Sequence, residues 1–197
     1  MKPFPIDNPG RIKGFILQLR VLFQISVLLL ILCACSTQPY TCDDPLGCLE
    51  ISRDEPVVIG AILATSGSGA QQGLDALAVI KTTLSEHDSL FGHPVNLIHY
   101  GTDCTPRSAL VGAMEFVLDE RLSGVIGPSC PIEEAATATI FRNAGLPWLS
   151  PVSDPMQVRE MVLRLLDALS AVGIATPQGT LYIPRQALYN LLMIPVR

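Results

Sequence analysis

Apolar and polar positions along the middle of the chain follow blocks of strand and helix length. Residues 57–63 read VVIGAIL, a continuous apolar run that suits a strand buried on both faces of a sheet. A turn rich in Gly and Ser follows, and residues 70–88 have the periodicity of a helix. The apolar stripe of that helix is predicted to consist of Leu74, Leu77, Ala78 and Leu84.

The same alternation is repeated in residues 95–120. A short strand is expected over residues 95–100 (VNLIHY), followed by a helix over residues 105–120. Thr105 suits the N-cap of this helix and Pro106 its first turn. Its apolar stripe is predicted to consist of Leu110, Ala113, Met114 and Val117.

A third strand is expected over residues 123–128, a third helix over residues 132–145 and a fourth strand over residues 146–151. Repeats of strand, turn and helix predict an α/β fold of three layers, a parallel sheet with right-handed crossovers and helices on both faces. Ligands bind such sheets at the carboxyl ends of the strands. Candidate site residues are therefore expected in the loops that follow the strands.

The N-terminal residues form a different block. Four basic residues and one acid precede residues 21–32, a run of twelve uncharged and mostly apolar positions. This pattern is typical of a signal peptide, and the run is shorter than the roughly 20 residues that span a bilayer. A single uncleaved anchor is the alternative interpretation.

Residues 32–35, LCAC, end that run and resemble the bacterial lipobox. The resemblance implies that residues 1–34 are a signal peptide and that Cys35 is lipidated and becomes the mature N-terminus. An acylated cysteine holds a soluble domain on a membrane. The expected location is therefore that of an exported membrane lipoprotein that faces the periplasm or the cell exterior.

Cys42 and Cys48 flank the turn-forming residues DDPLG. In an exported protein this spacing predicts a small disulfide loop. Two free thiols and a metal site are the alternatives, although zinc requires four ligands and the first histidine is His87.

Cys104 and Cys130 each follow a predicted strand, so both are expected at the carboxyl edge of the sheet. In an exported protein a disulfide between them is expected. Closing this loop would contribute on the order of 3 to 4 kcal/mol in the chain-entropy model.

Composition and motifs argue against several classes of function. The net charge of −5, with 13 Lys and Arg residues, gives no basic footprint for nucleic acid. Residues 67–73 (GSGAQQG) depart from the dinucleotide fingerprint in their glycine spacing, and the chain has no GKS or GKT. The three histidines are expected at the surface or half-buried, and Glu133 and Glu134 in the first turn of a helix. We expect no catalytic residue, metal site or cofactor.

Four motifs stand out in residues 55–153: TSGSGAQQG after the first strand, LFGHPVNLI, GPSC and AGLPWLSP. With these motifs the segment resembles the first lobe of the type I periplasmic binding proteins, specifically the substrate-binding proteins of branched-chain amino acid ABC transporters. Residues 165–192 are similar to the extreme C-terminal region of the same family. The resemblance implies that most of the second lobe is absent between these two pieces.

The domain organisation implied is a signal peptide (1–34), a lipid-anchored linker with a disulfide loop (35–55), an N-terminal lobe (56–153) and a remnant of the C-terminal region (154–197). The family also carries a disulfide at the positions of Cys104 and Cys130. The residues implied to face the ligand are Ser66, Gln72, Ser129, Cys130, Pro131, Val152 and Ser153. Gln72 and Pro131 depart from the family, which has an aromatic residue and a serine at these positions.

The function implied is capture of branched-chain or related amino acids for an ABC transporter permease. Such proteins close two lobes over the ligand, so the loss of one lobe is expected to impair binding. Two alternatives remain at this stage: a truncated remnant without function, and an extracytoplasmic enzyme on a Rossmann-like sheet.

Overall fold

The structure is a computed structural model that describes residues 20, 22–24, 40–150 and 154–193. The chain divides into two units, Met1–Tyr40 and Thr41–Arg197, and the account below concerns the second. Most of the predicted signal peptide, including Cys33 and the predicted lipidation site Cys35, lies outside the described residues. No described helix is long and apolar enough to cross a membrane.

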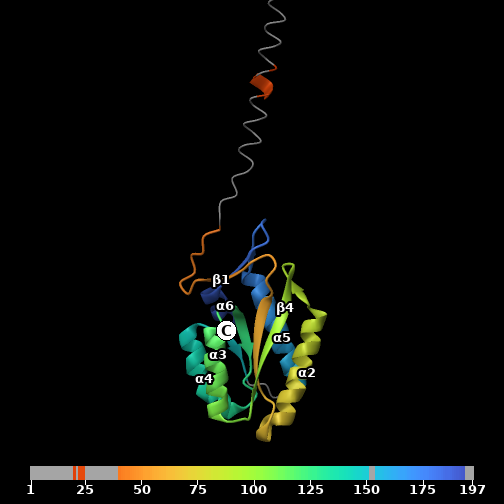
Figure 1. Cartoon of the computed structure of the whole chain (residues 1–197), viewed down its shortest axis with the longest axis vertical. Helices are drawn as coiled ribbons and strands as arrows, with labels where there is room; N and C mark the ends of the chain where they lie inside the picture. The colour runs from red at the N-terminus through yellow and green to blue at the C-terminus, as the bar shows by residue number, and fades with distance from the viewer. Residues whose placement is uncertain (1–19, 21, 25–39, 151–153, 194–197) are drawn as a thin grey trace, which may run out of the picture. The chain divides into compact units, whose positions relative to one another are not determined.

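The second unit is built on a five-stranded sheet with the spatial order β3-β4-β2-β5-β6 (Figure 1). Its strands are β2 (Val57–Ala64), β3 (Ser89–Leu90), β4 (His93–Thr102), β5 (Leu122–Ile126) and β6 (Trp148–Leu149). β2, β4, β5 and β6 run parallel, and only the short β3 pairs antiparallel, with β4.

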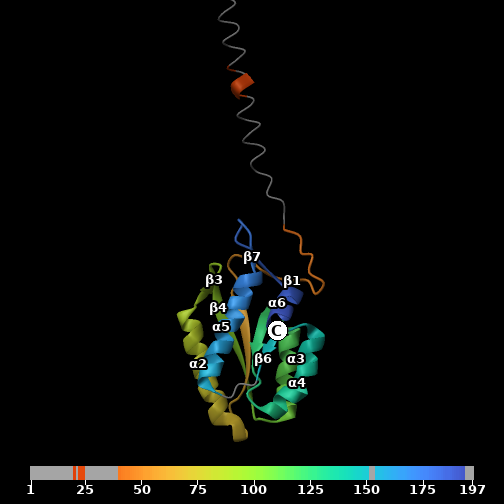
Figure 2. The same cartoon turned by 180° about the vertical axis from the view of Figure 1, so that it is seen from behind.

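Helices cover both faces of this sheet, as Figures 1 and 2 show. After the 3-10 turn η1 (Gly67–Gly69), α2 (Ala70–Glu86) packs beside α5 (Pro155–Val172) on one face. α3 (Pro106–Leu118) packs beside α4 (Pro131–Ala144) on the other face. The predicted three-layer α/β fold class is confirmed.

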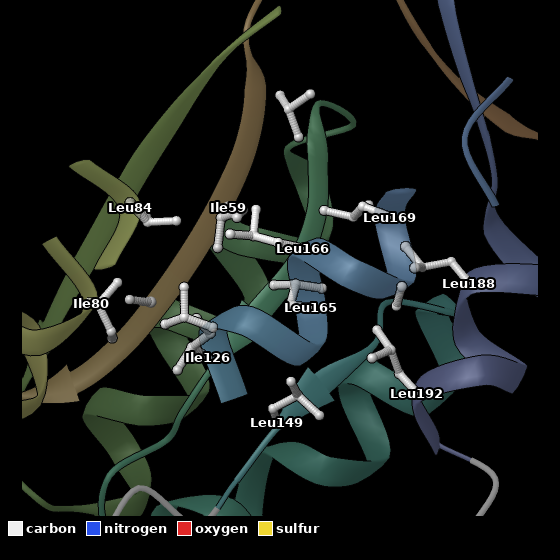
Figure 3. Packing of buried hydrophobic residues seen from close by; sticks show 14 of the residues in the cluster. Ile59, Ile80, Leu84, Ile126, Leu149, Leu165, Leu166, Leu169, Leu188 and Leu192 are labelled. Atoms are coloured by element: carbon white, nitrogen blue, oxygen red, sulfur yellow. The ribbon is translucent and has the colours of Figure 1, made fainter. Parts of the chain in front are cut away.

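β2 is the centre of the hydrophobic core because every one of its residues is buried. Its side chains alternate between the two faces, as the pleat of a strand requires. Ile59 and Leu63 join the cluster formed with α2 and α5, which Figure 3 shows from close by. Val58 and Ile62 join the cluster on the other face, where the rings of Phe141 and Trp148 lie 5.8 Å apart.

A second, antiparallel sheet joins the two ends of this unit. It has the order β1-β8-β7, with β1 at Cys48–Ile51, β7 at Ile174–Ala175 and β8 at Leu181–Pro184. Leu49 of β1 and Ile183 of β8 are directly opposite each other, and both are buried in the core that α5 covers. Part of the segment interpreted as a linker thus lies in a strand of the folded unit.

The last helix, α6 (Arg185–Met193), is tied to the small disulfide loop near the start of the unit. Cys42 and Cys48 are bonded, with their Cα atoms 6.0 Å apart. The carboxylate of Asp44, inside the loop, accepts the backbone N–H of Gln186 at 2.9 Å and that of Ala187 at 3.1 Å. Asp44 therefore caps the N-terminus of α6.

The helix stripes predicted from hydrophobic spacing are wrong in part. In α2 the buried face runs through Gly73, Ala76, Ile80 and Leu84, whereas Leu74 is 45% exposed. Helices that lie close to a sheet place small residues against it, so the larger apolar residues do not mark the buried face. A Cβ atom at Gly73 would come within 1.9 Å of the Ala64 carbonyl oxygen.

α3 shows the same error more clearly. Its buried face consists of Ala109, Gly112, Ala113 and Phe116. Of the predicted stripe, Ala113 is buried and Val117 is half-buried against the core, whereas Leu110 and Met114 are exposed. A Cβ atom at Gly112 would lie 2.4 Å from the ring of Tyr100, which shows how closely the helix approaches β4.

Candidate functional site

The candidate site lies where β2 and β5 end. β2 is the first parallel strand of the sheet, and its two neighbours, β4 and β5, are the second and third along the chain. The connections from β2 and β5 therefore leave toward opposite faces. In α/β sheets such a reversal of strand order opens a crevice beside the carboxyl ends of the strands, where ligands bind.

The loop after β5 is fixed closely against the end of β2. The Ser129 hydroxyl oxygen, which is buried, accepts the backbone N–H of Ala64 at 2.8 Å. Gly127 has a φ of +106°, and a Cβ atom there would lie 2.1 Å from the Ile62 carbonyl oxygen. Only glycine fits this position, so the two loops meet backbone to backbone.

The predicted disulfide between Cys104 and Cys130 is formed at this edge. It joins the loop after β4 to the loop after β5, with Cα atoms 5.7 Å apart. Because β2 lies between these two strands, the bridge crosses the end of β2. A Cβ atom at Gly69 would lie 2.6 Å from the Cys130 sulfur, so the start of α2 also packs against the bridge.

The loop after β2 is held to the end of β4 by its own backbone. The N–H groups of Thr65 and Ser66 donate to the Thr102 carbonyl at 2.9 and 3.2 Å. The Ser66 hydroxyl donates to the same carbonyl at 3.3 Å. Ser66 and Gln72 are both exposed, and thus are accessible to a ligand above the edge.

Two helices begin at the strand reversal without a side-chain cap. Among the described residues, no side chain caps α2 at Gly69 or α4 at Cys130. By contrast, Thr105 caps α3 and Asp154 caps α5. The first N–H groups of a helix lack partners within the helix and carry partial positive charge. The two uncapped ends can therefore bind an anionic group, such as a carboxylate.

Asp103, after β4, places a negative charge on the same edge. Its Oδ1 atom accepts hydrogen bonds from the hydroxyls of Ser108 and Thr105, the latter at 2.6 Å. These bonds lower the pKa of the Asp103 carboxyl. The side chain is therefore ionised at neutral pH, and its negative charge lies on the same edge as the partial positive charges of the two helix N-termini.

Glu133 lies in the first turn of α4, as the sequence predicts. Its side chain is fully buried, because it shares a helix face with the buried Thr137 and Phe141. Burial raises the pKa of the Glu133 carboxyl, against the opposing effect of the nearby Thr102 hydroxyl and Cys104 N–H. Within the described chain, no hydrogen bond of ordinary geometry reaches either carboxylate oxygen.

Helical spacing was the one sequence signal that could have identified Glu133. Residues four apart lie on the same helix face, and Glu133, Thr137 and Phe141 are so spaced. His93 was likewise expected at the surface or half-buried, and it is buried, with Nδ1 2.9 Å from the Glu55 carbonyl oxygen.

The structure brings together five of the seven residues implied to face the ligand. Ser66, Gln72 and Pro131 are exposed at or near the edge, and Ser129 and Cys130 are buried in its framework. The hydroxyl of Ser150, just after β6, donates a hydrogen bond to the Pro128 carbonyl at 3.0 Å. The end of β6 therefore lies at the same edge as the loop after β5. Val152 and Ser153 lie outside the described residues.

Several solved structures similar to this chain are described as substrate-binding proteins. A leucine-binding protein from Thermotoga maritima is 24% identical with a TM-score of 0.47, over 52% of this chain and 29% of its own. An ABC transporter substrate-binding protein from Sphaerobacter thermophilus is 26% identical with a TM-score of 0.46, over 48% of this chain and 26% of its own.

A third similar structure is the branched-chain amino acid transporter substrate-binding protein of Streptococcus pneumoniae, in complex with isoleucine. It is 20% identical with a TM-score of 0.44, over 48% of this chain and 28% of its own. The chain thus matches less than one third of the length of each of these proteins. No family model and no curated protein matches the chain.

Proposed function

We propose that this chain is an exported, lipid-anchored solute-binding protein that takes a branched-chain or related amino acid at the β2–β5 edge. In this proposal it delivers the amino acid to an ABC transporter permease and does no chemistry on it. The single observation that carries the proposal is the pair of uncapped helix ends, at Gly69 and Cys130, beside the strand reversal.

The chemistry of the edge suits a zwitterion. In the first turn of α4, Pro131 has no N–H and the Glu133 N–H donates to the Cys130 carbonyl at 3.0 Å, so the Ile132 N–H is the proposed donor for a carboxylate. At the start of α2 the Ala70 N–H donates to the Gly67 carbonyl, so the proposed donors there are the N–H groups that follow it. Asp103, with its lowered pKa, supplies a negative charge for an ammonium group. The exposed Ser66 and Gln72 add polar side chains at the rim.

The domain organisation is part of this proposal. Residues 1–34 are proposed as the signal peptide, Cys35 as the lipidated residue, residues 56–153 as the first lobe and residues 154–197 as the C-terminal region of a shortened binding protein. A second lobe would contribute further hydrogen bonds to the charged groups of the ligand, each worth about 1.5 to 3 kcal/mol. We therefore expect an affinity at least about a hundredfold below that of a two-lobe protein.

A charge placed at the end of α4 tests the proposal. Pro131→Glu puts a carboxylate at the first position of α4, where it favours the helix dipole but repels the ligand carboxylate. Calorimetry with L-leucine, L-isoleucine and L-valine is expected to give binding to the unmodified chain and binding at least about fivefold weaker to this variant.

Pro106→Glu is the matched control, because Pro106 is also exposed and also begins a helix, but that helix is capped by Thr105. Its affinity should equal that of the unmodified chain. Equal weakening by both substitutions, or no heat from a folded chain at millimolar amino acid, would contradict the proposed site.

A further inference from the structure

α3 presents a continuous apolar face away from the sheet. Four residues form this face, which we call the α3 stripe. Their exposed fractions are 36% for Leu110, 46% for Val111, 57% for Met114 and 78% for Leu118. Met114 lies four positions after Leu110 and three after Val111, and Leu118 lies four positions after Met114, so all of them fall on one side of the helix. The opposite face, with Ala109, Gly112 and Ala113, is buried against the sheet. The larger apolar side chains of α3 thus lie in the α3 stripe, and no other part of the described unit covers them.

Two opposite charges accompany the stripe. Arg107 and Glu115 are exposed and lie eight residues apart on α3, with Val111 midway between them. At 100° per residue both project on the stripe side of the helix, separated along its axis by about 12 Å. The ion pairs of the described chain, Arg121 with Asp119 and Arg159 with Glu86, involve neither residue.

We propose that a second copy of this chain covers the α3 stripe, with the two α3 helices antiparallel about a twofold axis at Val111. Such an axis reverses the direction of one helix relative to the other. Positions before Val111 in one copy therefore lie beside positions after Val111 in the other copy. Arg107 of each copy then lies at the level of Glu115 of the other copy. The contact is isologous, so it contains two equivalent ion pairs around an apolar centre.

The distances allow this pairing. Packed helices lie 8 to 10 Å apart, which arginine and glutamate side chains on facing helices can span. A helix of 13 residues is about 20 Å long, so this contact alone buries less than the roughly 1,600 Å² of a standard interface. The dimer is therefore weak and reversible.

Charge selects the second copy over other occupants. A membrane surface attracts helices whose polar border is rich in Lys and Arg, whereas this border carries one positive and one negative residue. Because Arg107 and Glu115 are equally far from Val111, a second, reversed copy of α3 places a positive charge at the level of each negative one. The inference does not depend on ligand binding at the β2–β5 edge.

Cross-linking of the full chain in the membranes of the bacterial cells that express it tests the pairing. In a Val111→Cys variant the two new thiols face each other across the axis, so mild oxidation is expected to give a disulfide-linked dimer. Leu74→Cys is the matched control on α2, where the replaced leucine is 45% exposed. It should give no dimer above the background of the unmodified chain.

Charge reversal then tests the predicted pairs. Added to Val111→Cys, Arg107→Glu is expected to lower the cross-linked fraction at least about threefold, since it puts like charges together. Adding Glu115→Arg as well should restore the fraction, which also shows that these exposed substitutions do not unfold the chain. Lys81→Glu, on the exposed side of α2, should leave it unchanged.

Three results would overturn the inference. The first is a cross-linked fraction for the Val111→Cys variant that is no higher than the fraction for the Leu74→Cys variant. The second is cross-linking that the Arg107→Glu reversal leaves unchanged. The third is a disulfide adduct of the Val111→Cys variant with a different protein in place of a second copy.

Discussion

At the scale of single residues, the buried carboxyl of Glu133 makes the stability of the fold depend on pH. Its side chain is fully buried in the first turn of α4, under the loops that form the candidate site. Burial in a medium of low polarity disfavours the charged form, so the pKa of Glu133 is raised from its ordinary value of 4.5. The folded chain therefore holds this carboxyl protonated at a pH where the unfolded chain has lost the proton.

This difference predicts how stability depends on pH. The contribution of a protonated Glu133 is fully present below about pH 4.5 and is lost as the pH rises through the raised pKa. Glu133→Gln keeps the shape of the side chain and cannot ionise. The change in the free energy of unfolding that this substitution causes is expected to be more favourable at pH 7.5 than at pH 4, by about 1 to 3 kcal/mol.

Urea unfolding at the two pH values measures this difference. Glu134→Gln is the control, since Glu134 lies in the same turn but is only half-buried. An effect of Glu133→Gln that is equal at pH 4 and pH 7.5 would contradict a buried, protonated carboxyl.

At the scale of elements, the parallel strands β2, β4, β5 and β6 and the helices between them followed from the sequence, but the helix faces and the antiparallel strands β1, β3, β7 and β8 did not. Apolar runs marked β2 and β5 because strands buried on both faces have no polar side. In α3 the same reasoning failed, because the large residues Leu110 and Met114 point away from the sheet and small residues face it. Hydrophobic spacing locates a helix, whereas the approach distance to the sheet decides which side is buried.

The contact between the disulfide loop and α6 was also not predictable from local pattern. Asp44 reaches backbone N–H groups more than 140 positions away, so only the paired β1 and β8 bring the two segments together. Asp44→Ala is expected to lower the free energy of unfolding by about 1 kcal/mol, the usual loss for a helix cap.

Denaturant unfolding checks this prediction, with Asp43→Ala as its control. Asp43 is the adjacent residue, is exposed, and makes no hydrogen bond to α6 among the contacts of the described chain. Equal losses for the two variants would show that Asp44 does not act as a cap.

At the scale of the whole molecule, the two segments that resemble separate parts of one family share a single core. α5 packs beside α2 on the sheet, and Leu165 and Leu169 of α5 lie in the cluster that contains Ile59 and Ile80 (Figure 3). The motifs of residues 55–153 and of residues 165–192 each predicted a resemblance to a different part of that family. The sequence could not predict that the two segments pack together, because that contact depends on which surfaces lie side by side after folding.

The predicted lipid anchor belongs to this scale as well. Metabolic labelling with an alkyne fatty acid in a bacterial host is expected to label the chain through Cys35, and to leave Cys35→Ala unlabelled. Cys33→Ala, which also removes a cysteine, should still be labelled. Labelling of Cys35→Ala would contradict the lipidation site.

The central claim is that an amino acid binds where β2 and β5 end. The most direct measurement is the change of backbone amide resonances of the folded, isotope-labelled chain as L-leucine is added to millimolar concentration. We expect saturable shifts in residues 66–70, 129, 130 and 132, at the two uncapped helix ends, and smaller shifts in residues 107–109 at the capped start of α3. No shifts, or shifts centred away from these two loops, would contradict the claim.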